Sequence, residues 1–150
     1  MGRTERRRSS LLSVPPLRLV RGETYHVLSV IQPWAWALVF AGQEIENRSR
    51  RTSHRGRLLI HAPATRRSAA EIAEARKLIA RCARVDLDQI PEEFGYSQIL
   101  GSVELIDCRE GVRSRWAQDD QKHWILESPR RLVTPVDEVR GRRNVWTWTA

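Results

Sequence analysis

Cysteine is scarce in this sequence and long apolar runs are absent, and each shortage excludes a class of protein. The 150 residues contain two cysteines, Cys82 and Cys108, with no CxxC pair or Cys/His cluster. They therefore indicate neither a disulfide framework nor a zinc site. No stretch approaches the roughly 20 consecutive apolar residues of a membrane-spanning helix. We expect a cytoplasmic protein without a metal or a cofactor.

Lysine and phenylalanine are also rare, whereas arginine and tryptophan are frequent. Six tryptophans stand against two phenylalanines, and Lys77 and Lys122 are the only lysines. The formal net charge is +8, and residues 1–22, with six arginines and one glutamate, carry +5 of it. A basic protein of this kind suits a polyanionic partner such as RNA. A solvated basic leader with no ligand explains the same charge.

We predict that the chain consists of a leader and one domain. Residues 1–22 mix Arg, Ser and Pro, which is typical of a disordered segment. The apolar part of LLSVPPLRLV is short and is broken by two prolines, so we do not interpret it as a signal peptide. Residues 23–150 are long enough for one ordinary domain, which we expect to be monomeric.

The first half of the domain is predicted to contain three strands and a short helix. Strands are expected at 24–31, 44–49 and 57–62, because these segments are rich in apolar residues or alternate in polarity. Segment 33–41 is expected to form a largely buried helix. Gly42 should end it, because glycine readily adopts a left-handed conformation.

The second half is predicted to contain one long helix and three further strands. Ser68 and Glu71 form a capping box, and apolar residues at helical spacing follow. Strands are expected at 97–108, 122–128 and 144–149, and the first, which is apolar on both faces, should lie centrally. Five or six strands with two helices, without regular βαβ alternation, indicate an α+β fold or a small barrel.

Several motifs in the right order resemble the ASCH domain (activating signal cointegrator homology) over roughly residues 25–148. The family's features are a QPWA-like helix start, a G-x-K-x-x-E-x-R segment and an RG-x-L-x-I-H-A strand. The matching residues in this sequence are Gln32, Pro33, Trp34 and Ala35, then Glu46 and Arg48, then Arg55, Gly56, Leu58, Ile60, His61 and Ala62.

The resemblance implies the fold of the similar PUA domain, a small pseudo-barrel of mostly antiparallel strands. It also implies RNA association in a polar cleft beside the first helix, and hydrolysis of RNA or acetylated nucleosides in some members. The hydrolytic members use a lysine, a threonine and a later glutamate, and the corresponding positions here are Gln43, Glu46 and Glu104. A glutamine is neither a base nor a nucleophile, so this chain lacks the lysine that the chemistry requires.

Glu46 and Arg48 are the first candidates for the cleft, since residues two apart on a strand share a face. Arg48 could bind a phosphate or a base edge, with Glu46 orienting it. The alternative is a solvated strand face with a weak ion pair. Trp34 could stack on a base, whereas Trp36 cannot share its helix face and is expected in the core.

Four further residues complete the candidate set for ligand binding. Gln32 and Gln43 carry amides that can hydrogen-bond a ligand. Arg55, in the turn before the strand at 57–62, could contact phosphate, or it is a solvated turn arginine. His61 is either a cleft residue or a structural histidine.

Glu104 lies between Val103 and Leu105 in the predicted central strand, so its carboxylate must be paired, hydrogen-bonded or protonated. It is either a functional acid with Arg48 as its partner or part of a structural ion pair. Three functions are therefore considered: an RNA or nucleotide-binding module, a small hydrolase with Glu46 and Glu104 as acid and base, and a protein-interaction domain. The glutamine at the lysine position favours binding over hydrolysis.

Overall fold

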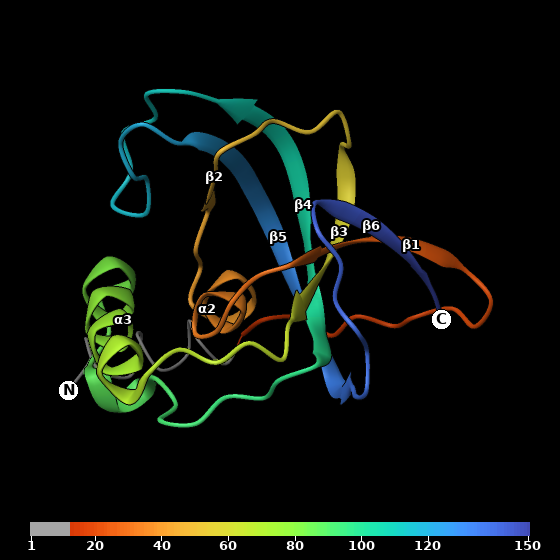
Figure 1. Ribbon diagram of the computed structural model, residues 1–150, viewed down its shortest axis with the longest axis horizontal. Helices are drawn as coiled ribbons and strands as arrows, with labels where there is room; N and C mark the ends of the chain where they lie inside the picture. The colour runs from red at the N-terminus through yellow and green to blue at the C-terminus, as the bar shows by residue number, and fades with distance from the viewer. Residues whose placement is uncertain (1–12) are drawn as a thin grey trace.

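The computed structural model describes residues 13–150, which form one six-stranded sheet with two helices (Figure 1). The helices are α2 (Trp34–Phe40) and α3 (Ala69–Ala83), and η1 (Leu87–Gln89) is a short 3-10 helix. This architecture confirms the predicted α+β fold. The strands are β1 (Thr24–Ser29), β2 (Ile45–Arg48), β3 (Gly56–Ala62), β4 (Gln98–Arg109), β5 (Lys122–Val136) and β6 (Val145–Thr149).

The strands lie in the order β2-β5-β4-β3-β1-β6. Neighbouring strands are antiparallel, except that β1 and β3 pair in parallel across the connection formed by α2 and β2. β2 and β6 are therefore the two edges of the sheet. They do not pair with each other in the described residues, so the sheet is not closed into the small barrel that the sequence left as an alternative.

The two longest strands, β4 and β5, form the centre of the sheet, and β5 differs from its prediction. The sequence predicts that this strand ends at residue 128, but it continues through Pro129 to residue 136. The register with β4 shifts between Ser102 and Glu104. Pro129 lies at this irregularity, where its missing N–H interrupts no regular hydrogen-bond ladder. Because of this irregularity, β5 continues beyond Pro129, whereas a proline usually ends a strand.

The short helix α2 lies between the sheet and α3 (Figure 1). On one side its Leu38 belongs to the apolar core over the sheet, and on the other its Ala37 packs in a cluster with Ile79 of α3. A helix covered on two sides needs the nearly continuous apolar sequence that α2 has. α3 begins with the predicted capping box between Ser68 and Glu71.

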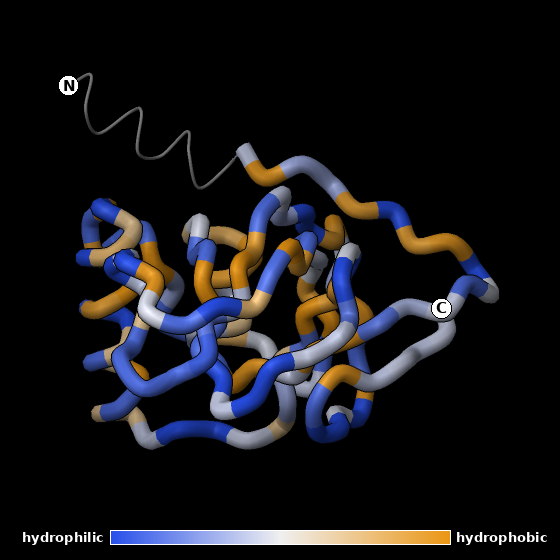
Figure 2. The backbone as a smooth tube through the Cα atoms, turned by 90° about the horizontal axis from the view of Figure 1, so that it is seen from above, coloured by the Kyte–Doolittle hydropathy of each residue, from blue (hydrophilic) through white to orange (hydrophobic). Residues whose placement is uncertain are grey.

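Residues 13–22 pack on the sheet, so the prediction of a disordered leader is wrong for this part of segment 1–22. Leu17 is 5% exposed and joins a cluster with Tyr25 and Ile99. Its N–H donates to the carbonyl oxygen of Arg131, within β5, at 2.7 Å. Apolar stretches separated by more polar ones follow one another along this segment (Figure 2). The amino-acid composition of the segment indicated disorder, because composition does not show whether a single leucine such as Leu17 is buried. The rest of the predicted leader lies outside the described residues.

Two features are absent from residues 13–150. None of their helices is long and apolar enough to cross a membrane. Their His, Cys, Asp and Glu side chains form no group of three or more that could hold a metal ion.

Candidate functional site

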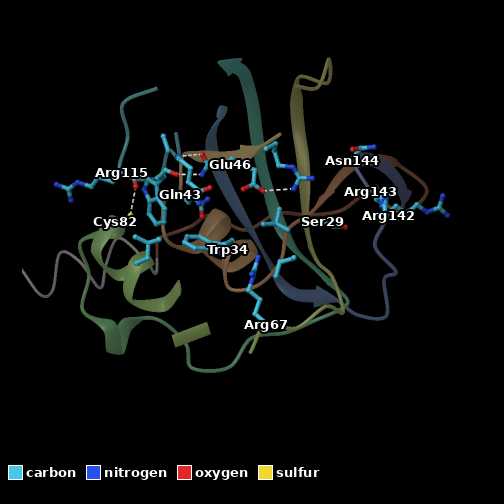
Figure 3. A pocket seen from close by; sticks show the side chains of 18 residues that line it. Ser29, Trp34, Gln43, Glu46, Arg67, Cys82, Arg115, Arg142, Arg143 and Asn144 are labelled. Atoms are coloured by element: carbon cyan, nitrogen blue, oxygen red, sulfur yellow. Dashed lines mark hydrogen bonds and ion pairs between the residues drawn. The ribbon is translucent and has the colours of Figure 1, made fainter. Parts of the chain in front are cut away.

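A cavity of about 580 Å³ opens beside the start of α2 (Figure 3). Its walls come from the end of β1, the start of α2, β2, α3 and two loops at 115–118 and 142–144. These segments are far apart in the sequence, so only the folded chain forms the cavity. Four residues predicted for a cleft line it: Trp34, Gln43, Glu46 and Arg48.

Glu46 is the only carboxylate among the described residues that line the cavity. It is 7% exposed, and burial, which penalises the charged form, raises the pKa of Glu46 to about 7. Arg48 opposes this shift, with its Nη1 3.6 Å from Oε2 of Glu46, and the Asn47 backbone N–H opposes it as well. The cavity therefore holds a carboxyl group that can change its protonation near neutral pH.

Gln43 lines the same cavity and carries a buried acceptor without a partner among the described residues. The residue is 5% exposed, and its Nε2 donates to the Ile45 carbonyl oxygen at 2.8 Å. Its Oε1 is buried and has no hydrogen-bond donor among the described residues. An unpaired buried carbonyl oxygen costs about 1–3 kcal/mol, so this atom is suited to a ligand donor.

The two tryptophans of α2 have different surroundings. Trp34, the first residue of the helix, is partly exposed and lines the cavity. Trp36 stacks on Phe40, with 5.9 Å between ring centroids, and meets Phe94 edge-on at 6.3 Å. Of these two tryptophan rings, only that of Trp34 belongs to the lining of the cavity, which also includes Trp116.

Five arginines make the lining strongly basic: Arg48, Arg67, Arg115, Arg142 and Arg143. With a single carboxylate among them, they attract an anionic ligand. Arg115 and Arg142 lie at opposite ends of the cavity (Figure 3). Of these five, only Arg48 was predicted from the sequence, although the pair Arg142 and Arg143 shortly before the last strand was a signal in the sequence.

A second hollow of about 580 Å³ adjoins the cavity and shares Arg48, Arg143 and Asn144 with it. Its other walls include Arg50 and Arg51, which follow β2. A basic surface therefore continues from the cavity past the end of β2.

Asn47 and Cys82 hold the loop at 115–118 in place as one wall. The Asn47 Nδ2 donates to the Trp116 carbonyl at 2.8 Å, and its Oδ1 accepts from the Gln118 N–H at 2.8 Å. The Cys82 thiol donates to the Arg115 carbonyl at 3.3 Å. Burial raises the pKa of this thiol, which keeps it protonated and a poor nucleophile.

A family model for the ASCH domain matches residues 28–139. The chain belongs to the ASCH family. Over 126 residues it is 31% identical to "Activating signal cointegrator 1" of Homo sapiens and 30% identical to the Mus musculus protein of that name. Each match covers 79% of this chain but 21% of the relative, so the chain spans about a fifth of their length. The PUA-like fold of the family agrees with the mixed sheet and two helices observed here.

Gln32 and Arg55, two residues predicted for the cleft, lie outside the cavity lining, as does His61. Gln32 is buried, and its Oε1 accepts from the Trp36 N–H at 2.9 Å while its Nε2 donates to the Gly95 carbonyl at 3.0 Å. It therefore anchors the start of α2 to the loop after η1. Arg55 lies in an exposed turn, with its Nη2 3.9 Å from Oδ1 of Asp107.

His61 of the ASCH motif has a structural environment. It is fully buried, with Nε2 2.7 Å from the Val139 carbonyl and Nδ1 2.8 Å from Ser29 Oγ. A carbonyl only accepts, so Nε2 carries the proton and Nδ1 accepts from the serine; burial lowers the pKa of the ring. A Cβ on Gly141 would lie 2.8 Å from Cε1 of His61, so this glycine lets the chain pass close to the ring before the loop at 142–144.

Glu104 does not line the cavity, and its ionic partner is not Arg48. Its side chain is 36% exposed, and its Oε1 lies 3.8 Å from Nε of Arg57, the residue opposite it on β3. Ile106, two residues along β4, is 46% exposed. The prediction of a functional acid beside Arg48 is therefore wrong, because a strand with apolar residues on both faces does not reveal which face is covered.

Proposed function

We propose that this ASCH domain binds single-stranded RNA, with one base in the cavity and the neighbouring phosphates on the surrounding arginines. The observation that carries the proposal is the composition of one cavity. It combines the partly exposed ring of Trp34, the buried polar groups of Gln43 and Glu46, and five arginines.

Each component suits a different part of a nucleotide. Stacking of a base on an aromatic ring contributes about 1–3 kcal/mol. Arginine forks bind phosphate oxygens in pairs of parallel hydrogen bonds. The amide of Gln43 and the carboxyl of Glu46 can hydrogen-bond the edge of a base.

The second hollow favours a strand over a free nucleotide as the ligand. It continues the basic lining through Arg48 and Arg143 to Arg50 and Arg51. A phosphodiester backbone that leaves the cavity in this direction meets further arginines, which suits sequence-tolerant binding of single strands. ASCH domains are PUA-like modules often linked to RNA binding, which supports the same interpretation.

The test is fluorescence polarisation with a labelled single-stranded RNA of about nine nucleotides, within the range that one small domain contacts. We expect micromolar affinity at low salt and a steep loss as salt rises. Replacing Arg142 and Arg143 by alanine should weaken binding and reduce the slope of log K against log salt by up to about 1.4, or about 0.7 for each phosphate contact. Arg57→Ala is the matched control, since Arg57 pairs with Glu104 outside the cavity. Absence of binding by the full chain at low salt would show that the proposal is wrong.

A small hydrolase is the second candidate, and the pKa of Glu46 near 7 is the observation that favours it. A carboxyl group that titrates near neutral pH can act as a general acid or base. Glu104 cannot be its partner, because it lies outside the cavity lining. Such an enzyme would therefore depend on Glu46 alone to activate water.

A further inference from the structure

We propose that the cavity selects guanine, with the Glu46 carboxylate accepting a hydrogen bond from its N1–H and Gln43 Oε1 accepting one from its 2-amino group. This inference rests on the proposed RNA binding and adds the identity of the preferred base. It starts from two buried acceptors, Gln43 just before β2 and Glu46 within it, that line one cavity with Trp34 (Figure 3).

The orientation of the Gln43 amide is determined by its neighbour. The Ile45 carbonyl oxygen can only accept a hydrogen bond, so the atom 2.8 Å from it must be the amide nitrogen. A flipped amide would place two oxygens against each other and cannot form this bond. The Oε1 atom is therefore the one without a donor among the described residues, and the ligand atom that suits it is an N–H.

Glu46 supplies a second acceptor in the lining of the same cavity. A carboxylate offers about four lone-pair positions. The described donors to Glu46 are the Arg48 side chain and the Asn47 backbone N–H, which leaves capacity for a ligand. Because the residue is 7% exposed, a donor from a base replaces little water and forms its bond in a low-dielectric site.

Among the four RNA bases, guanine has two adjacent N–H donors on its Watson–Crick edge. Adenine and cytosine each place an amino group beside a ring nitrogen lone pair, which would face one of the two acceptors. Uracil has one N–H between two carbonyl oxygens. A buried polar site that hydrogen-bonds its ligand rejects analogues that leave its groups unpaired, so Gln43 and Glu46 together favour guanine.

The preference should depend on pH through Glu46. The other titratable groups in the described lining are Cys82, held as a thiol, and five arginines: Arg48, Arg67, Arg115, Arg142 and Arg143. Among these groups of the described lining, only Glu46 changes charge near neutral pH. When it is protonated, its O–H opposes the guanine N1–H and suits instead the lone pair of cytosine N3 or adenine N1.

The test uses the full chain and four RNAs of about nine nucleotides, each an oligouridine with guanine, inosine, adenine or cytosine at the centre. At about pH 8, where Glu46 is ionised, we expect the guanine RNA to bind about tenfold more tightly than the adenine RNA. Inosine, which lacks the 2-amino group, should lie between them. Equal binding of all four would overturn the guanine inference and leave the proposed function standing. Failure of all four to bind would overturn the proposed function itself.

Two further measurements connect the preference to its residues. In Gln43→Leu the guanine-to-adenine ratio should fall toward one, whereas Glu104→Gln, the matched change outside the cavity lining, should keep it. In the natural chain the ratio should fall as the pH is lowered from about 8 to about 6, through the pKa of Glu46. This second measurement needs no variant, so a folding defect cannot obscure it. A ratio that stays constant with pH would contradict the assigned role of Glu46.

Discussion

Arg48 and Glu46 form an ion pair that does not offset the burial of the carboxylate. The Arg48 Nη1 lies 3.6 Å from Oε2 of Glu46, yet the pKa of Glu46 is raised to about 7. The desolvation free energy of a buried carboxylate is larger than its electrostatic attraction to one partly exposed guanidinium group. The pKa of Glu46 therefore stays close to neutral pH, and changes at either residue of the pair should shift properties that can be measured.

Glu46 should give the folding stability an unusual dependence on pH. Its pKa in the folded chain lies above the ordinary value of 4.5, so the folded state binds the proton more tightly than the unfolded state. The free energy of unfolding should therefore fall as the pH rises from about 4.5 to about 7, by up to about 3 kcal/mol. Urea unfolding across this range measures the effect. Glu46→Gln should remove this part of the pH dependence, and an unchanged profile in that variant would contradict it.

Arg48→Ala should raise the pKa of Glu46 above about 7, because it removes the attraction that lowers it. The same change should weaken RNA binding more than it weakens folding, since charge-assisted hydrogen bonds contribute about 1.5–3 kcal/mol. The carbon-13 NMR shift of the Glu46 carboxyl reports the titration, and polarisation reports binding. A large drop in melting temperature with RNA binding intact would instead make the pair structural.

Gln43→Lys separates the binding module from the hydrolase. If Gln43 occupies the family's lysine position, the natural chain should not hydrolyse acetylated cytidine or RNA, because a carboxamide neither titrates nor attacks a carbonyl. We would assay the natural chain, Gln43→Lys and Glu46→Gln side by side. Turnover by the natural chain that Glu46→Gln abolishes would favour the hydrolase. Turnover by Gln43→Lys alone would show that the cavity lacks only the lysine.

Leu17→Ala should reveal that residues 13–22 belong to the folded domain. Leu17 is 5% exposed in the cluster with Tyr25, and truncation of a buried leucine costs about 2–5 kcal/mol. Val20, at 59% exposed, provides the control, and Val20→Ala should change the free energy of unfolding by less than about 0.5 kcal/mol. Equal, small effects of the two changes would mean that the segment adds nothing to stability.

His61→Ala should destabilise the fold by at least about 2 kcal/mol, because it opens a cavity and leaves the Ser29 hydroxyl and the Val139 carbonyl without this partner. The pKa of His61 is lowered by burial, so the unfolded state binds its proton more readily. This contribution to stability is present above about pH 6.5 and is lost as the pH falls below it. Thermal melts at several pH values measure both effects. His26→Ala, at an exposed position of β1, is the control.

The sequence by itself determined the secondary structure and the family of this protein. Alternating and β-branched segments predicted strands close to those observed, except that β5 continues past residue 128 to residue 136, and the capping box at Ser68 set the start of α3. The ASCH motif led to Trp34, Gln43, Glu46 and Arg48. All four lie in α2, in β2 or in the short segment between them. Local periodicity is enough for such features, because they depend on residues that are neighbours in the chain.

Only the tertiary structure decided which polar residues share the cavity. Arg67, Arg115, Arg142 and Arg143 reach it from segments that the sequence does not connect. Glu104 is a glutamate like Glu46 and is next to apolar residues, but it lies outside the cavity lining. Strand pairing places it opposite Arg57 on an exposed face. The ordering of residues 13–22 and the pKa of Glu46 also depend on burial by distant segments. Burial is a property of the packed chain, and no local pattern contains it.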